Sequence, residues 1–425
     1  MTIREKAAAM KLDSTQMASK SAEIRNQALA NIARALLENQ EDIFRANEQD
    51  LAEALENDIP EAVVKRLKFN IEKLTGVVKG IEELIGLSDK VYETQLVRQL
   101  DEGLTLVRES CPIGVIGVIF EARPDALVQI ASLCIKSGNC AILKGGSETK
   151  HTNKTVFSLI YHAATESGLP ENCLFQAEQR DEISELLACH ESVDLLIPRG
   201  SNAFVQYIMN NTRIPVMGHA DGICHIYVDK DFDIGKAIPV IVDAKTQYTA
   251  VCNAVETLLV HKDAVDVLMP RLNEAFRARN VELRATADIA DRYGCKLATD
   301  ADFATEYLDL IISAKTVADI DEAILHINKY GSHHTDCIVT ENSEAAEHFM
   351  RMVDSAGVYQ NCSTRFADGF RYGFGAEVGV STGKIHARGP VGLEGLLTYK
   401  YKLYGNGQVV ADYVSGKKAF HFTDL

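Results

Sequence analysis

The sequence has no apolar run long enough to span a membrane. A spanning helix needs about 18 or more predominantly apolar residues, and every apolar run of this chain falls well short of that length. The N-terminal stretch MTIREKAAAMKLDSTQ carries several charges and only a short apolar run, so it lacks the core of a signal peptide. We therefore expect a cytoplasmic protein with no membrane partner.

The chain also lacks a basic patch. Its formal net charge is −16 at pH 7, and its densest basic stretches, VVKRLK and SGKKAF, are short and interrupted. Because an acidic surface repels a phosphate backbone, we expect no nucleic-acid partner. This charge is compatible with an enzyme that holds a small anionic ligand through a few local cations and backbone amides.

Paired cysteines are missing as well. The chain contains ten cysteines, but none of them forms a C-x-x-C motif and several lie inside apolar runs. This pattern argues against a zinc site and against a disulfide framework, and it favours a reducing compartment. The neighbouring His333 and His334 are expected to point in different directions, and no H-x-x-x-H spacing accompanies them. We therefore predict no metal site.

What the chain does contain is a long alternation of strands and helices. A length of 425 residues indicates two or three domains. From Thr105 onward, buried apolar strands alternate with helices, one of which is bounded by Pro124 and Gly138. The strands IPVM and CHIYVD close this first series, and a second series begins near Asp233. This alternation predicts an α/β fold whose mostly parallel sheets are covered on both faces.

One late strand, LTYKYKLYG at 397–405, follows a glycine-rich stretch. Too little chain remains after it for another large domain. We therefore expect this strand to pair with the early strand around residues 104–107, or with a neighbouring subunit.

Two strand ends have features of a nucleotide site. In LKGGSETK, Gly145 allows close backbone approach, Lys144 can contact a ribose or phosphate, and Ser147 can donate to a 2′-phosphate. In IPRGSNAF, Gly200 and Ser201 offer donors to a pyrophosphate at a helix start. These features favour NADP over NAD. A loop with a solvated lysine explains the first stretch equally well, and the G-x-G-x-x-G fingerprint does not occur.

Cys252 lies in QYTAVCNAVETLLVH, at residues 247–261. A free cysteine is most often a small buried apolar residue. Cys252, however, follows a polar connecting segment and precedes a buried strand, a position where functional residues are commonly held on a rigid scaffold. A thiolate there can attack a carbonyl carbon, and nearby backbone N–H groups can stabilise the oxyanion. Both readings stay open on the residues alone.

A family resemblance adds to this reading. The segments that carry it are CPIGVIGVIFEARPD, ILKGGSET, LIPRGS, GICHIYVD, CNAVETLLVH, EYLDLI, NCSTRF and HARGPVGLEGL. In order and spacing they closely resemble the gamma-glutamyl phosphate reductases, a family within the aldehyde dehydrogenase superfamily. The resemblance covers about residues 5–405.

The resemblance implies an aldehyde dehydrogenase-like fold with two doubly wound parallel-sheet domains and a small β oligomerisation flap. Residues 1–94 and 112–240 would form the dinucleotide-binding domain, and residues 241–380 the catalytic domain. Residues 95–111 and 381–425 would form the flap and the C-terminal tail. A homo-oligomer is expected.

The resemblance also assigns roles to residues. Cys252 would be the nucleophile with Asn253 beside it, and Lys144, Gly145 and Ser147 would contact the adenosine ribose or its 2′-phosphate. Gly200 and Ser201 would lie by the pyrophosphate, and Glu306 by the nicotinamide ribose. The substrate's α-carboxylate would be held by Ser363, Thr364 and Arg365.

Two segments depart from the superfamily pattern. Hydrolytic aldehyde dehydrogenases carry a Glu that activates the deacylating water, whereas the matching stretch here, PVMGHADGICH, offers only His219 and Asp221. The usual oxyanion Asn is replaced by Ala122 and Arg123 in FEARPD. This leaves the backbone N–H groups at Cys252 and Asn253 as candidate donors.

The resemblance therefore implies an NADPH-dependent reduction of L-glutamyl 5-phosphate to L-glutamate 5-semialdehyde and phosphate, through a thioester on Cys252. This is a step of proline biosynthesis, and it implies functional coupling to glutamate kinase. One alternative is a hydrolytic NAD(P)-dependent dehydrogenase for another small aldehyde. The other is a scaffold that kept the fold and lost the chemistry.

Overall fold

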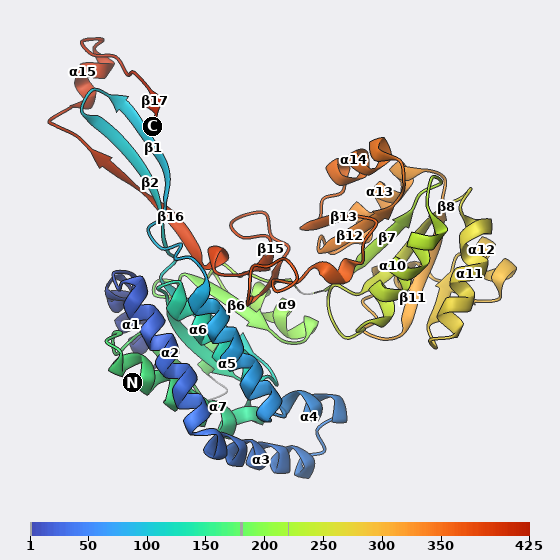
Figure 1. Cartoon of the computed structure of the whole chain (residues 1–425), viewed down its shortest axis with the longest axis horizontal. Helices are drawn as coiled ribbons and strands as arrows, with labels where there is room; N and C mark the ends of the chain where they lie inside the picture. The colour runs from blue at the N-terminus through green and yellow to red at the C-terminus, as the bar shows by residue number, and fades with distance from the viewer. Residues whose placement is uncertain (1, 179–181, 220) are drawn as a thin grey trace. The chain divides into compact units, whose positions relative to one another are not determined.

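The computed structural model describes residues 2–178, 182–219 and 221–425, and Figure 1 shows the chain. Its contacts divide it into two compact units. Unit 1 comprises Met1–Met217, Phe374–Gly379 and Val391–Leu425, and unit 2 comprises Gly218–Gly373 and Val380–Pro390. Among the described residues, no helix is both long and apolar enough to cross a membrane.

Unit 1 contains a parallel sheet in the order β5-β4-β3-β6. The chain runs from β3 (Val115–Phe120) through β4 (Cys140–Gly145) to β5 (Leu174–Ala177), and then returns to place β6 (Leu195–Arg199) on the other side of β3. This reversal beside β3 is a topological switch point. In open α/β sheets, ligands bind at the carboxyl ends of the strands at such a point.

Helices cover this sheet, and local signals set their ends. Helix α6 begins at Pro124, in the first turn where proline is tolerated. It ends just before Gly138, whose φ of +73° is a left-handed conformation that favours glycine. Both predicted ends are therefore confirmed. The helices of unit 1 are α1 (Ile3–Ala18), α2 (Ala22–Glu38), α3 (Gln40–Glu56), α4 (Glu61–Leu67), α5 (Ile71–Gly86), α6 (Pro124–Lys136), α7 (Lys150–Glu166), α8 (Glu182–Leu187), α9 (Asn202–Asn210) and α15 (Val410–Val414).

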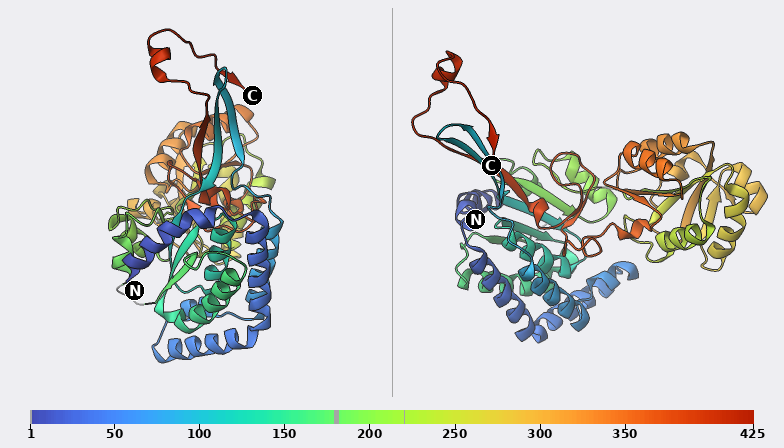
Figure 2. Two further views of the ribbon diagram at one scale, coloured as in Figure 1. Left: turned by 90° about the vertical axis from the view of Figure 1, so that its left-hand side faces the viewer. Right: turned by 45° about the horizontal axis from the view of Figure 1, so that its top comes forward.

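An antiparallel sheet in the order β16-β2-β1-β17 also belongs to unit 1. Strand β16 (Leu397–Tyr404) pairs along its whole length with β2 (Leu104–Pro112), while β1 (Thr94–Asp101) pairs with β2 and with the short β17 (Thr423–Asp424). The views in Figures 1 and 2 show this sheet extending away from the parallel sheet of the same unit. The predicted pairing of the late strand with the early one is confirmed.

Unit 2 contains a seven-stranded parallel sheet in the order β10-β9-β11-β8-β7-β12-β13, covered by further helices. The strands at the centre of this sheet are buried on both faces, which explains their largely apolar sequences. The strands are β7 (Cys224–Val228), β8 (Val255–His261), β9 (Glu282–Ala285), β10 (Lys296–Leu297), β11 (Ile311–Val317), β12 (Thr335–Val339) and β13 (Gly357–Gln360). The helices are α10 (Ile234–Thr246), α11 (Val265–Arg277), α12 (Ala287–Tyr293), α13 (Ile320–Tyr330) and α14 (Ser343–Met352).

Short elements complete the chain. Strands β14 (Gly379–Ser381) and β15 (Gly389–Val391) pair with each other. The 3₁₀ turns are η1 (Ser147–Thr149), η2 (Asp300–Ala304), η3 (Thr364–Phe366) and η4 (Glu394–Leu396).

The placement of two predicted strands differs from expectation. The CHIYVD strand, β7, was expected in the first sheet, but it pairs with β8 and β12 of the second. The IPVM segment contributes only one isolated bridge, between Leu196 and Val216. A strand buried on both faces has the same apolar pattern in either sheet, so the sequence does not reveal which neighbours it takes.

Candidate active site

The residues predicted to bind the pyrophosphate and the adenosine ribose of the cofactor meet at the carboxyl edge of the unit 1 sheet. Gly145, at the end of β4, and Arg199, at the end of β6, both lie beside Phe120, the last residue of β3. Lys144 and Ser147 therefore lie on one side of the β3 end, and Gly200 and Ser201 on the other. We call this group the cofactor edge.

The corner after β6 is built to hold an anion. The backbone N–H of Ser201, which precedes the first turn of α9, donates to the Glu121 carboxylate at 2.9 Å. A Cβ at Gly200 would lie 2.4 Å from the same carboxylate, so a larger residue would displace the Glu121 side chain. Similarly, the N–H of Ala122 donates to Glu148 at 2.6 Å. Backbone N–H donors at a helix start can bind a phosphate. In this structure the Glu121 carboxylate accepts the hydrogen bond from Ser201 that a phosphate oxygen could accept.

Lys144 and Ser147 differ in exposure. The Lys144 side chain is buried, and its Nζ donates to the Gly145 carbonyl at 2.7 Å. Burial lowers the pKa of this amine, while the carboxylates of Glu182 and Glu148 act in the opposite direction. Ser147 is exposed at the start of η1. Lys144 therefore offers a cation, and Ser147 an exposed hydroxyl.

Glu306 lies in unit 2, between η2 and β11. Its charge contributes to raising the pKa of Glu256, so the two carboxylates are neighbours. Glu306 therefore belongs to unit 2, whereas the other predicted cofactor residues all belong to unit 1.

Cys252 lies in the turn that joins α10 to β8, and its side chain is half-buried. Its backbone is closely packed: a Cβ at Gly222 would lie 2.2 Å from the Cys252 carbonyl oxygen and 2.3 Å from its Cα. The Cys224 thiol donates to the same carbonyl at 3.2 Å. These contacts fix the position of Cys252 at the amino end of β8.

Two histidines accompany Cys252. The ligand atoms of His219, Cys252 and His334 all lie within 4.8 Å of one another, and the two imidazole rings meet edge to face with centroids 4.8 Å apart. Each of the three residues precedes a different strand, β7, β8 and β12 in that order, and these strands are adjacent in the parallel sheet. Their amino ends therefore meet at one edge. We call these three residues the thiol cluster.

The predicted substrate segment packs beside Cys252. The Thr364 hydroxyl donates to the Asn253 carbonyl at 2.7 Å, and the Asn253 amide donates to the Ala367 carbonyl at 2.9 Å. The Arg365 guanidinium donates to the Gln247 side chain at 2.9 Å. Burial lowers the pKa of Arg365, whereas the negative charge of a Cys252 thiolate acts in the opposite direction. The structure therefore brings Asn253, Thr364 and Arg365 together with the thiol.

Other candidate side chains have structural partners. The Ser363 hydroxyl accepts from the Arg365 backbone N–H at 3.3 Å. Arg371 donates to the Arg365 carbonyl, and Arg388 pairs with Asp354 at 3.1 Å.

A buried ion pair supports the turn that carries Cys252. Lys245 lies in the last turn of α10 and Glu256 lies in β8. Lys245 Nζ and Glu256 Oε2 are 2.6 Å apart, and both side chains are fully buried. Burial raises the pKa of Glu256 to about 7 and lowers the pKa of Lys245. The pair joins the two elements on either side of the turn that contains Cys252.

Sequence reasoning missed several of these residues, namely His219 and His334 as neighbours of the thiol, Gly222, Gln247, and the pair Lys245 and Glu256. One available signal was the polar character of the positions just before β7, β8 and β12. The strand order was still required to join them.

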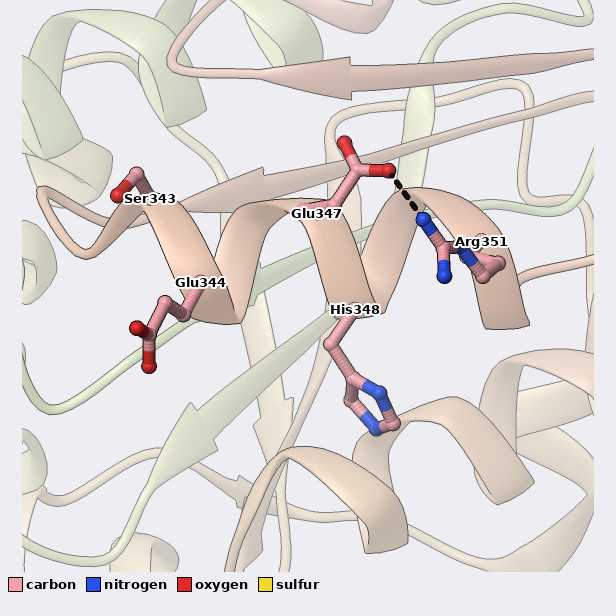
Figure 3. A pocket seen from close by; sticks show the side chains of 5 residues that line it. All are labelled: Ser343, Glu344, Glu347, His348 and Arg351. Carbon is pink, nitrogen blue, oxygen red and sulfur yellow. Dashed lines mark hydrogen bonds and ion pairs between the residues drawn. The ribbon is translucent and has the colours of Figure 1, made fainter.

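A surface depression of about 390 Å³ lies elsewhere, on α14 (Figure 3). It is lined by one exposed helix face, on which Glu347 and Arg351 form an ion pair of 2.9 Å. His348 pairs with Asp321 at 2.8 Å. None of the predicted site residues lines it.

The fold and the thiol site define a class of protein. The model of the aldehyde dehydrogenase family matches residues 2–290, and the chain belongs to this family. Its members are oxidoreductases, and the family implies a nicotinamide cofactor, which the cofactor edge described above fits.

Within this family, the gamma-glutamyl phosphate reductases are similar to the chain over its full length. The enzyme from Acetivibrio thermocellus is 54% identical over 420 residues, which cover 99% of this chain and 97% of the relative. The crystal structure of the Thermotoga maritima gamma-glutamyl phosphate reductase superposes with a TM-score of 0.93 at 39% identity, over 95% of this chain and 99% of that one. The resemblance seen in the sequence is thereby confirmed.

A more distant structure shows the fold alone. An acetylating aldehyde dehydrogenase from Geobacillus thermoglucosidasius is 16% identical and superposes with a TM-score of 0.65, covering 96% of this chain and 97% of that one. The predicted aldehyde dehydrogenase-like α/β fold is confirmed.

Proposed function

We propose that the protein reduces L-glutamyl 5-phosphate to L-glutamate 5-semialdehyde and phosphate, with NADPH as the reductant. The observation that carries this proposal is the half-buried Cys252, held by Gly222 and flanked by Arg365, in a chain 54% identical to a gamma-glutamyl phosphate reductase.

The first step is attack by the Cys252 thiolate on the acyl phosphate carbon. The C–S bond forms, the C–O bond to phosphate breaks, and phosphate leaves with the electron pair. Other cysteines are poor nucleophiles, because burial raises the pKa of Cys134 and Cys173 to about 12. These thiols stay protonated near neutral pH, and in the proposal they only pack.

Backbone donors next to the thiol support the oxyanion. Among the described residues, none accepts a hydrogen bond from the backbone N–H of Cys252 or of Asn253. Asn253 is itself fixed by Thr364 and Ala367. In the proposal, these two N–H groups stabilise the negative charge on the carbonyl oxygen in the tetrahedral states before and after the thioester.

The substrate carboxylate pairs with Arg365 in this scheme. Arg365 is only 8% exposed, and its Nε is oriented by Gln247. A planar guanidinium binds a carboxylate through two parallel hydrogen bonds, so a fixed Arg365 also sets the direction of the substrate chain. Ser363 and Thr364 shape the same turn.

NADPH, when bound, supplies the hydride that converts the thioester into a thiohemiacetal. In the proposal the cofactor edge holds it: Gly200 and Ser201 at the pyrophosphate, Gly145, Lys144 and Ser147 at the ribose 2′-phosphate. Glu306 is assigned to the nicotinamide ribose. The thiohemiacetal then collapses, with the C–S electron pair returning to Cys252 as thiolate and the semialdehyde leaving.

The setting of the enzyme is part of the same proposal. All ten cysteines are free thiols in the structure, which agrees with a reducing cytoplasm.

Strand β16 forms one edge of the antiparallel sheet and exposes Tyr399, Tyr401 and Leu403. An apolar edge strand pairs readily with another chain, which supports a homo-oligomer through this flap. Because the acyl phosphate is a reactive substrate, we also propose functional coupling to glutamate kinase.

A coupled assay tests the function. Glutamate, ATP, glutamate kinase and NADPH are mixed with and without this protein, and NADPH absorbance is followed. The proposal predicts oxidation of NADPH only when all components are present. No oxidation above the kinase-only background would contradict it.

A further inference from the structure

The thiol cluster has a second chemical property that the reductase scheme does not use. Two imidazoles and one thiol, His219, His334 and Cys252, place one ligand atom each within 4.8 Å of the others. Nitrogen and sulfur donors of this kind bind zinc and related divalent transition metals, whereas magnesium and calcium prefer oxygen.

In both imidazole rings of the thiol cluster, the Nδ1 atom contacts an oxygen atom of another residue. Nδ1 of His219 lies 2.8 Å from the Val380 carbonyl oxygen, which can only accept, so the proton is on Nδ1 and the lone pair is on Nε2. Nδ1 of His334 lies 2.9 Å from the Thr335 hydroxyl. Metal-binding histidines typically engage the second ring nitrogen in this way, which fixes ring orientation and tautomer.

His334 provides an independent sign of a missing ligand. Its side chain is fully buried, and its Nε2 has no hydrogen-bond partner among the described residues. A buried polar atom without a partner costs free energy. A metal ion bound together with Cys252 would satisfy it.

The spacing needs only a small adjustment. Zinc bonds of about 2.0–2.3 Å in a tetrahedron place ligand atoms about 3.4–3.6 Å apart. Because the present separations are 4.8 Å or less, each must shrink by at most about 1.4 Å. The Cys252 side chain is half-buried and can rotate, whereas its backbone is fixed. Three protein ligands leave a fourth position for water. The charge of Arg365 opposes the cation, which predicts weaker binding than at a structural zinc site.

We propose that His219, Cys252 and His334 form a binding site for zinc-class divalent ions, and that occupation of this site reversibly blocks the thiol. Binding replaces the thiol proton by the metal, so one proton is released and no electron is transferred. Because the bound sulfur can no longer attack a carbonyl, the ion acts as an inhibitor. Its removal by a chelator restores the free thiol.

Cobalt binding tests the site without any assay of turnover. The chelator-treated full chain is titrated with Co²⁺, and the near-ultraviolet sulfur-to-cobalt charge-transfer band and the visible bands of tetrahedral cobalt are recorded. We expect one equivalent to bind, and Zn²⁺ to displace it. Cys252→Ser should lose the charge-transfer band, and His219→Asn or His334→Asn should weaken binding about 10-fold or more. Cys295→Ser and His348→Asn are matched controls that should bind cobalt like the wild type.

A second measurement needs no variant, since His334 is buried and its replacement can affect folding. The wild-type chain is alkylated with iodoacetamide with and without Zn²⁺, and each cysteine peptide is quantified. We expect Zn²⁺ to protect Cys252 at least about 10-fold and to leave Cys295 unchanged, with EDTA restoring reactivity. Equal alkylation of Cys252 with and without Zn²⁺, or a cobalt band that persists in Cys252→Ser, would overturn the proposal. Both results are independent of whether the chain reduces glutamyl phosphate.

Discussion

In unit 1 the cofactor edge follows the carboxyl ends of β3, β4 and β6, whereas in unit 2 the thiol cluster precedes the amino ends of β7, β8 and β12. The first edge consists of glycines, backbone N–H groups, the buried Lys144 and exposed serine side chains. The second consists of a thiol and two imidazoles that are held by neighbouring residues, with Gly222 packed against the Cys252 backbone and Val380 hydrogen-bonded to His219. In the proposed function, the residues of the cofactor edge bind the cofactor and Cys252 of the thiol cluster carries the chemistry. Changes at the two edges should therefore affect different measured quantities.

The strongest test of this comparison removes the nucleophile. Cys252→Ser should lower kcat by about 10³-fold or more, because a serine hydroxyl is not ionised here and an oxyester accepts hydride poorly. NADPH affinity, measured by fluorescence titration, should not change, since the cofactor edge is intact. Cys295→Ser is the control and should keep wild-type kcat. Activity near the wild-type value in Cys252→Ser would show that the Cys252 thiol is not the nucleophile of the reaction.

The next prediction concerns the buried ion pair between Lys245 and Glu256, which supports the turn that contains Cys252. Lys245→Met leaves Glu256 buried without its partner, and the free energy of unfolding should fall by about 3–5 kcal/mol. Urea unfolding at pH 7.5 measures this. The double variant Lys245→Met with Glu256→Leu removes both charges and should recover most of the loss. A single variant as stable as the wild type would mean that the pair does not hold the turn.

The same pair predicts a pH dependence of stability in unit 2. Burial raises the pKa of Glu256 from 4.5 to about 7, so between these values the folded state keeps a proton that the unfolded state has lost. The contribution of Glu256 to stability is therefore complete below pH 4.5 and is lost as the pH rises through about 7. Glu256→Gln should lack this loss when urea unfolding is compared at pH 5 and pH 8. An identical pH profile for both proteins would contradict the assignment.

Gly222 offers a way to move the nucleophile without removing it. In Gly222→Ala the new Cβ must displace the Cys252 backbone, and a displacement of about 1 Å lowers kcat about 10²-fold. KM for NADPH should stay unchanged. Gly80→Ala, in helix α5, has open space around the added Cβ and serves as the control. If Gly222→Ala kept wild-type kcat, close packing would not be what positions Cys252.

The smallest expected effect concerns the cofactor edge. Ser147→Asp places a carboxylate where the 2′-phosphate is proposed to bind, so KM for NADPH should rise about 10-fold while KM for NADH changes little. Ser147→Ala removes the hydroxyl without adding charge and should have a smaller effect. Parallel rises in both KM values would show that Ser147 does not distinguish the two cofactors.

The strand–glycine–helix corners of the cofactor edge could be located from the sequence, whereas the meeting of the three thiol-cluster residues could not, and the reason is physical. Gly145, Ser147, Gly200 and Ser201 belong to strand–glycine–helix corners, in which a few consecutive residues determine the local backbone. Helix α6 was predicted correctly for the same reason, since Pro124 and Gly138 mark its ends locally.

The thiol cluster depends on strand order instead. His219, Cys252 and His334 are far apart in the chain, and they meet only because β8, β7 and β12 are adjacent. Strand order follows from the packing of the whole sheet, which explains why β7 was assigned to the wrong sheet. In the sequence, His333 and His334 were judged only as a pair of adjacent residues. The neighbours of His334 in the structure, His219 and Cys252, come from other segments of the chain. The His333 ring contacts the Asp354 carbonyl instead.

The phosphate requirement of the reverse reaction tests the central claim most directly. Glutamate 5-semialdehyde and NADP⁺ are incubated with the protein, with and without inorganic phosphate or arsenate, and NADPH formation is followed. We predict sustained turnover only when phosphate or arsenate is present. The stretch PVMGHADGICH contains no glutamate that could activate water for release of the acyl group. Sustained turnover without either anion would show that water releases the acyl group, and it would contradict a phosphate-dependent reductase.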